Sequence, residues 1–360
     1  MSEPEVIFED WSPVCNINAF VEKSDTCYYF YLWINPQSDD AVVKSCWICN
    51  AGEAPEELDV ENMEQGLAPA MPKQYVLHDV CGMELNPDEL SVIWFEEGNA
   101  AALLYGGEII SVIPPWSGYN GFEGYAKYAK GTTPLAWGLS EAAEVIGKRV
   151  EQSRIFWEGF ERDFWGDAQT QHMEALEKFY GQHEKYYAID GGKFPPKALI
   201  RGSRGGAIYG ITAGVSLIPM PNVEQSYGDD FREYRRMELG FAVTAEHEEL
   251  TNPMFSFMSG LSAFPWREET FLAHGHTVPV KFIGGYEAVL FVNPRMVPGL
   301  EAPDYKDCMG EKINLLWLVP ITGEEYRFIM EHDISENLSY ATDIFRIHIF
   351  DGKRKFPDMV

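Results

Sequence analysis

Residues 313–332 read INLLWLVPITGEEYRFIMEH, and this stretch decides how the second half of the chain folds. Its first part, Ile313 to Val319, is a continuous apolar run of strand length. Thr322 and Glu325 then have the spacing of a capping box, in which each side chain accepts a hydrogen bond from the other residue's amide. The sequence therefore predicts a strand that passes directly into a helix starting at Thr322.

The segments before this stretch carry alternating strand and helix patterns. They predict strand, strand, helix, strand and strand over residues 207–219, 235–243, 253–264, 278–282 and 287–292. A last strand is predicted over Ile344 to Phe350. This order favours a sheet covered by helices, which is a mixed α/β (α+β) architecture.

The first part of the chain is dominated by strand patterns. Tyr28 to Ile34 is apolar on both faces, which predicts a central strand. Further strands are predicted over residues 42–48, 75–80 and 90–95. Gly106 and Gly107 separate two apolar runs, 100–105 and 108–113, and two glycines between such runs are typical of a hairpin turn.

The length of the chain, 360 residues, exceeds what one hydrophobic core usually serves, so we expect two lobes, each a mixed sheet flanked by helices. The pattern changes from strand to helix after Ser140, which can cap a helix. We therefore predict an acidic N-terminal lobe over 1–138, a helical connector over 139–190 and a second lobe over 191–360.

The charge of the chain limits the partners that it can bind. The formal net charge is -28, and residues 1–138 hold 22 acidic residues against 5 basic ones. Such a surface repels nucleic acids and anionic membranes, so neither is an expected partner. It either keeps the protein dissolved or steers it toward a basic protein, and the sequence leaves both interpretations open.

The cysteine usage and the N-terminus predict a cytoplasmic protein. The first residues, MSEPEVIFEDW, lack the basic and apolar regions of a secretory signal, and we find no apolar run near 18 residues. Six cysteines spread over the chain are too few for a disulfide scaffold. Free thiols in a reducing compartment are expected.

The second lobe resembles the suppressor-of-fused domain, a family found in an animal signalling regulator and in many bacterial proteins. The segments that carry the resemblance are, in order, AIYGITAGVSLIPMP (207–221), YRRMELGFAV (234–243), NPMFSFMSGLSAF (252–264), LAHGHTVPV (272–280), YEAVLFVNPRMVPG (286–299) and residues 313–332. In the animal member an Asp follows the Gly-hydrophobic-Ser turn and helps to hold a partner peptide. This chain has Leu217 there, which puts that binding mode in doubt.

The resemblance implies an α/β domain that binds protein without a cofactor. For bacterial members it implies a role as immunity proteins, which neutralise secreted toxins. We therefore predict a non-catalytic protein of immunity or antitoxin type whose partner is a protein, such as a basic toxin. Two alternatives stay open: a hydrolase-type enzyme with a pocket between the lobes, and an adaptor that binds a peptide by strand addition.

The residues that could carry chemistry form no complete site. Cys46 and Cys49 form a CxxC, but a zinc site needs a second pair or added histidines. His274 and His276 alone leave a metal's coordination shell unfilled. Neither a Ser nucleophile motif nor a phosphate-binding loop with its Lys is present. We predict no catalytic residue, no cofactor and no metal.

Exposed arginines and aromatic residues are the candidates for partner contact. Arg232, Arg235 and Arg236 form the densest basic cluster of the chain, and Trp116 and Tyr119 stand in an aromatic loop. Arg, Trp and Tyr are enriched at interface hot spots, which is the reason for choosing these five residues. The alternative for the arginines is internal ion pairing with the many acids.

Overall fold

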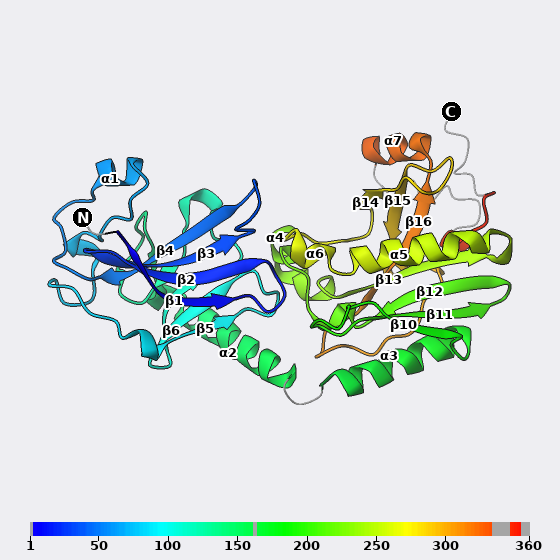
Figure 1. Ribbon diagram of the computed structural model, residues 1–360, viewed down its shortest axis with the longest axis horizontal. Coiled ribbons are helices and arrows are strands. Elements are labelled where there is room, and N and C mark those ends of the chain that lie inside the picture. The colour runs from blue at the N-terminus through cyan, green and yellow to red at the C-terminus, as the bar shows by residue number, and fades with distance from the viewer. Residues whose placement is uncertain (1–2, 161–163, 333–345, 354–360) are drawn as a thin grey trace. The chain divides into compact units, whose positions relative to one another are not determined.

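The computed structural model describes residues 3–160, 164–332 and 346–353. The chain divides into two compact units, Met1–Arg162 and Asp163–Val360, which are described separately (Figure 1). Three sheets and several helices confirm the predicted mixed α/β class. The division falls inside the segment 139–190, whose bounds as a connector stay a prediction. No described helix is both long and apolar enough to cross a membrane.

The first sheet of the first unit is an antiparallel meander in the order β1-β2-β3-β4. Its strands are β1 (Glu5–Trp11), β2 (Ile17–Lys23), β3 (Cys27–Ile34) and β4 (Val42–Asn50). The predicted central strand is β3, which pairs with both β2 and β4. Strand β1 was not predicted, because this edge strand is acidic and mostly exposed and so lacks a clear apolar face.

The second sheet of the first unit has the order β5-β6-β7-β8-β9, with one parallel pair, β8 and β9. Its strands are β5 (Leu90–Trp94), β6 (Ala101–Tyr105), β7 (Glu108–Ile113), β8 (Tyr125–Ala126) and β9 (Trp137–Gly138). The predicted hairpin is confirmed. Gly106 and Gly107 have φ of 56° and 84°, the left-handed values that such a tight turn needs.

The strand predicted over Tyr75 to Val80 is wrong. The structure has a short 3-10 helix there (Lys73–Tyr75) and a single β-bridge from Val76 to Ala129. The apolar residues Leu77 and Val80 are 55% and 52% exposed, so they do not form the buried face that the pattern indicated.

Two helices complete the first unit: α1 (Val60–Glu64) and α2 (Ala143–Phe160). Helix α2 buries Ile146 and Val150 against Phe95, Ala102 and Val112 of the second sheet. The apolar spacing of this helix was readable from the sequence because its buried positions recur about every fourth residue.

The second unit contains one sheet in the order β10-β11-β12-β13-β16-β15-β14, with β17 beside β13. Its strands are β10 (Lys185–Ala188), β11 (Ala198–Arg204), β12 (Ala207–Ala213), β13 (Met237–Thr244), β14 (Thr277–Pro279), β15 (Ala288–Val292), β16 (Asn314–Ile321) and β17 (Ile349–Phe350). Its helices are α3 (Phe164–Tyr180), α4 (Val223–Tyr227), α5 (Thr251–Leu261), α6 (Phe264–Arg267) and α7 (Gly323–Glu331).

Helices α3 and α5 cover opposite faces of this sheet (Figure 1). Tyr209 of β12 stacks edge-on against Phe179 of α3, with ring centroids 5.3 Å apart. The next residue, Gly210, faces Phe255 of α5 so closely that a Cβ would lie 1.9 Å from its ring. Consecutive strand residues point to opposite faces, so the two helices sandwich the sheet.

The junction from β16 to α7 forms as predicted. The Thr322 hydroxyl accepts from the Glu325 amide at 3.2 Å, and the Glu325 carboxylate accepts from the Thr322 amide at 2.7 Å. Of the predicted last strand, residues 344 and 345 lie outside the described residues, and Ile349–Phe350 forms β17. The strand predicted over residues 207–219 ends at Ala213, where a tight turn replaces it.

Candidate functional site

The tight turn after β12 is the centre of the second unit's polar interactions. It consists of Gly214 and the 3-10 helix η5 (Val215–Leu217). Gly214 has φ of 98°, and a Cβ there would lie 2.6 Å from the Pro196 carbonyl oxygen and 2.7 Å from the Trp165 ring. Only glycine fits this position, because the conformation is left-handed and the space is closed.

Glu238 of β13 holds the turn from one side. Its side chain is fully buried. One carboxylate oxygen accepts from the amides of Gly214 and Ser216, at 3.0 and 3.1 Å, and from the Ser216 hydroxyl at 2.7 Å. The other oxygen accepts from the Thr212 hydroxyl at 2.7 Å. A buried carboxylate needs such donors, because they replace the water that it has lost.

His172 of α3 supplies the balancing charge. Its Nε2 lies 3.2 Å from Glu238 Oε1, and its Nδ1 lies 2.7 Å from the Ala168 carbonyl oxygen. Nδ1 faces the backbone carbonyl, and Nε2 faces both the Glu238 carboxylate and the Ser216 hydroxyl, so in its protonated form the ring can donate from both nitrogens. Burial alone would lower the pKa of His172, but its hydrogen bond and charge interaction with Glu238 leave the pKa raised. Burial alone would raise the pKa of Glu238, and His172, Ser216 and Thr212 leave it lowered.

Ser216, His172 and Glu238 together resemble a hydrolytic triad in composition but not in arrangement. The Ser216 hydroxyl donates to Glu238 and lies 3.1 Å from His172 Nε2. In a triad the imidazole must have a free lone pair to take the proton of the serine. Here Ser216 and Glu238 both lie at Nε2 and a backbone carbonyl lies at Nδ1, so the carboxylate does not orient the imidazole from its other nitrogen as it does in a triad. The sequence held one signal of this cluster, a Glu inside the apolar strand MELGFAV.

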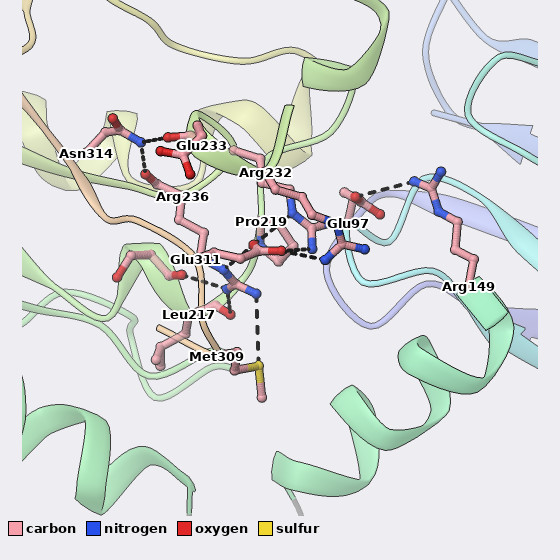
Figure 2. Close-up of polar contacts among 12 residues, drawn as sticks. Glu97, Arg149, Leu217, Pro219, Arg232, Glu233, Arg236, Met309, Glu311 and Asn314 are labelled. Atoms are coloured by element: carbon pink, nitrogen blue, oxygen red, sulfur yellow. Dashed lines mark hydrogen bonds and ion pairs between the residues drawn. The ribbon is translucent and has the colours of Figure 1, made fainter. Parts of the chain in front are cut away.

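Arg236 holds the same turn from the other side, as Figure 2 shows. Its Nη1 donates to the carbonyl oxygens of Ser216 and Leu217, at 2.9 and 2.7 Å. Its Nε donates to Glu311 at 2.8 Å, and its Nη2 lies 3.9 Å from the Met309 sulfur. The amides of the turn therefore donate to an anion, Glu238, and its carbonyl groups accept from a cation, Arg236.

Glu311 gathers all three arginines of the predicted basic cluster. Its carboxylate accepts from Arg232 at 2.7 Å, from Arg235 at 2.9 Å and from Arg236. Arg235 and Arg236 are 2% and 1% exposed, whereas the Arg232 side chain is 46% exposed. The internal ion pairs that the sequence left as the alternative are present for all three. Burial alone would raise the pKa of Glu311, and Arg235 and Arg236 leave it lowered.

The two predicted aromatic residues lie in the first unit. Trp116 packs against the core of the second sheet, and the Arg149 guanidinium lies 5.6 Å from its ring centroid. Arg149 also forms an ion pair with Glu97 at 3.5 Å, drawn in Figure 2. Tyr119 is 60% exposed at the tip of the aromatic loop. Of these residues, Tyr119 offers its ring to solvent.

The cysteine and histidine pairs named in the sequence stand in apolar or structural settings. Cys46 and Cys49 are buried, and burial raises the pKa of Cys46 to about 12 and that of Cys49 further. His274 accepts a hydrogen bond from the Asn293 amide at 3.1 Å, and His276 lies against Phe271. Among the residues that the structure describes, no group of three or more His, Cys, Asp or Glu could hold a metal ion.

One comparison with known proteins, a match to a family model, agrees with the resemblance seen in the sequence. A family model described as suppressor of fused protein matches residues 199–355, which include Ser216, Arg236, Glu238 and Glu311 but not His172. A crystal structure described as a putative suppressor-of-fused homolog from Neisseria gonorrhoeae FA 1090 is 18% identical, covering 47% of this chain and 86% of its own, with a TM-score of 0.30. A search of curated proteins found no match.

The His172–Glu238 pair predicts how stability depends on pH. Because the folded pKa of His172 lies above 6.5, its contribution is complete below pH 6.5 and is lost as pH rises through the raised pKa. The contribution of Glu238 to the free energy of unfolding is complete above pH 4.5 and is lost as pH falls through its lowered pKa. In urea unfolding, His172→Gln should cost about 3 kcal/mol near pH 6, the order for breaking a buried pair, and less toward pH 9.

The matched control for that experiment is His183→Gln, because His183 follows the same helix and its side chain is 34% exposed. The free energies of unfolding of the wild type and of this control should change with pH in the same way. A stability difference between wild type and His172→Gln that stays constant from pH 6 to 9 would show that His172 is not charged in the folded protein.

Glu311 should be among the acids whose loss destabilises the fold most. Glu311→Gln removes the carboxylate that two buried guanidinium groups share, so we expect a loss of about 3–5 kcal/mol in the free energy of unfolding. Glu233→Gln is the control, since Glu233 pairs with Arg295 at the surface and should cost less than about 1 kcal/mol. Equal effects of the two substitutions in urea unfolding would contradict the role given to Glu311.

Proposed function

We propose that this chain, whose residues 199–355 form a suppressor-of-fused domain, is a non-catalytic protein that acts by binding another protein. The observation that carries the proposal is the use of the domain's buried polar residues. Ser216, His172 and Glu238 satisfy one another and the backbone of a turn, so they support the stability of the domain. The resemblance to the suppressor-of-fused family, whose model matches residues 199–355, implies a protein-binding role and so supports the proposal.

The partner that we propose is a basic protein, and the role is that of an immunity or antitoxin protein. The support is the acidic first part of the chain, where residues 1–138 hold 22 acidic residues against 5 basic ones. A negative surface accelerates encounter with a positively charged protein and repels nucleic acid. Tyr119 and Arg232 are the partner contacts that we propose from the predicted set, because their side chains reach solvent. Trp116 would support Tyr119 from within the same loop.

The proposed location is the cytoplasm. All six cysteines are free thiols, including the pair Cys46 and Cys49 in one strand. Free thiols persist in reducing compartments, whereas secreted proteins tend to oxidise theirs.

The partner proposal is tested by binding purified products of the adjacent genes to the full-length protein. We expect one basic protein to bind, and Tyr119→Ala to weaken that binding about tenfold, as loss of an interface aromatic residue does. Val145→Ala, which changes an equally exposed residue of α2, is the control and should leave the affinity unchanged. Binding by none of these products, together with no specific partner in a pull-down from the native lysate, would refute the proposal.

A second candidate function, strand addition, is favoured by the outer strand β10. Among the described strands β10 pairs only with β11, and it contains no proline, whereas the opposite edge strand β14 ends in Pro279. The Ile189 amide bonds to the Lys197 carbonyl oxygen, so by alternation the amides of Tyr186 and Ala188 point away from β11. An extended peptide could pair there.

Strand addition predicts that a proline in β10 abolishes partner binding. Ala188→Pro removes an outward amide donor and should reduce the affinity at least about tenfold, while Ala188→Ser should not. The measurement is the same titration with the identified partner, with thermal unfolding to check that each variant is folded. Unchanged affinity of a folded Ala188→Pro protein would exclude β10 as the site of pairing.

A further inference from the structure

A groove of about 290 Å³ lies within the first unit. It is bounded by the turn between β2 and β3, by helix α1 and by the segment 66–70. Its apolar walls include Tyr31, Pro55 and Leu67, and Leu67 is 40% exposed. An exposed apolar wall in a depression is the usual property of a binding site.

The wall formed by segment 66–70 is held in place by buried side chains. The Tyr29 hydroxyl donates to the Pro69 carbonyl oxygen at 2.8 Å, and the Cys27 thiol lies 3.4 Å from the Ala68 carbonyl oxygen. Just beyond this segment, Asn50 accepts from the Met71 amide and donates to the Met71 carbonyl oxygen, both at 2.8 Å. These bonds fix the backbone, so the groove exists before any ligand enters, which lowers the entropy cost of binding.

Four carboxylates line the same groove, and no cation does so among its described lining residues. The carboxylates belong to Glu22, Asp25, Glu53 and Asp59. The nearby lysines Lys23 and Lys73 are paired elsewhere, with Glu84 and Glu56. The groove therefore combines apolar walls with a purely negative lining.

Two observations restrict the class of ligand that could bind in this groove. Burial raises the pKa of Glu22, more than the hydrogen bond from Tyr31 lowers it, and a cation beside this carboxylate would relieve that cost. The acids of the described residues are nowhere gathered closely enough to hold a metal ion. A larger organic cation with an apolar stem can pack its stem against the apolar walls and pair its charge with the separated carboxylates.

We propose that this groove receives a lysine or arginine side chain of the partner protein, with its stem against Tyr31 and Leu67 and its charged head among Glu22, Asp25 and Glu53. The inference rests on the proposed function and deepens it, since it gives the basic partner a specific place to bind. The charge complementarity is strong because the surrounding unit is itself acidic. Arginine fits the lining best, because its planar fork can bond two carboxylates at once.

The first test uses small probes on the full-length protein. N-acetyl-arginine methylamide is titrated while backbone amide shifts are followed by NMR, with N-acetyl-citrulline methylamide as the neutral probe of equal shape. We expect saturable shifts at Thr26, Leu67 and Ala68 with the arginine probe and at least about threefold weaker binding of the citrulline probe. Equal binding of both probes, or no saturable shift at these amides, would overturn the inference.

Substitutions then separate the groove from the general negative field. Glu22→Gln should weaken binding of the arginine probe about threefold, as loss of one partly exposed charge does. Asp40→Asn makes the same charge change in the turn between β3 and β4, outside the groove, and should have no effect. If Glu22→Gln unfolds the protein, Leu67→Ala tests the apolar wall in its place. Equal effects of the groove and control variants would refute a specific site.

These experiments distinguish a failure of the groove inference from a failure of the proposed function. A partner that binds wild type and Glu22→Gln equally well would refute the groove and leave the proposed function standing. Specific binding of the arginine probe without any protein partner would support the groove and refute the proposed function.

Discussion

The second unit depends on a turn that is bonded from both sides. The amides of Gly214 and Ser216 donate to Glu238, while the carbonyl groups of Ser216 and Leu217 accept from Arg236. A buried turn contains backbone N–H and C=O groups that have no partner in a sheet or helix. Each such group left unpaired would lower the free energy of unfolding by about 1–3 kcal/mol. Placing an anion at its amides and a cation at its carbonyl groups removes that cost and fixes how β12 leads into β13.

This arrangement extends into a chain of alternating charges. The His172 ring faces Glu238, the turn separates Glu238 from Arg236, and Arg236 pairs with Glu311, which also binds Arg235. Burying these groups is costly, and the cost is offset only because every member has several partners. This series of charged side chains connects helix α3, strands β12 and β13 and the segment before β16. Polar side chains used in this way serve the fold.

Local signals made part of this structure predictable from the sequence. The capping box at Thr322 and the hairpin at Gly106 and Gly107 depend on residues a few positions apart, and both are confirmed. The clusters around Glu238 and Glu311 could not be predicted, because each carboxylate meets residues more than 60 positions away in the chain. An Arg in a basic run looks the same in sequence whether it faces solvent or a buried Glu. Burial was therefore the property that sequence reasoning missed for Arg235 and Arg236.

The same burial reduces the number of cationic side chains that reach the surface. Cations are scarce in this chain, 28 against 56 acids, and several of them serve inside: Arg235, Arg236 and Lys197, whose ammonium donates to the Ser262 carbonyl oxygen. A cation held inside by a buried acid or a carbonyl group makes no direct contact with an approaching molecule, although its charge still adds to the long-range field. Long-range attraction speeds the encounter of oppositely charged proteins, whereas contacts in a fixed, apolar pocket govern how slowly they part. For the basic partner that we propose, the acidic exterior would act on the encounter and the rigid groove lined by carboxylates would act on dissociation.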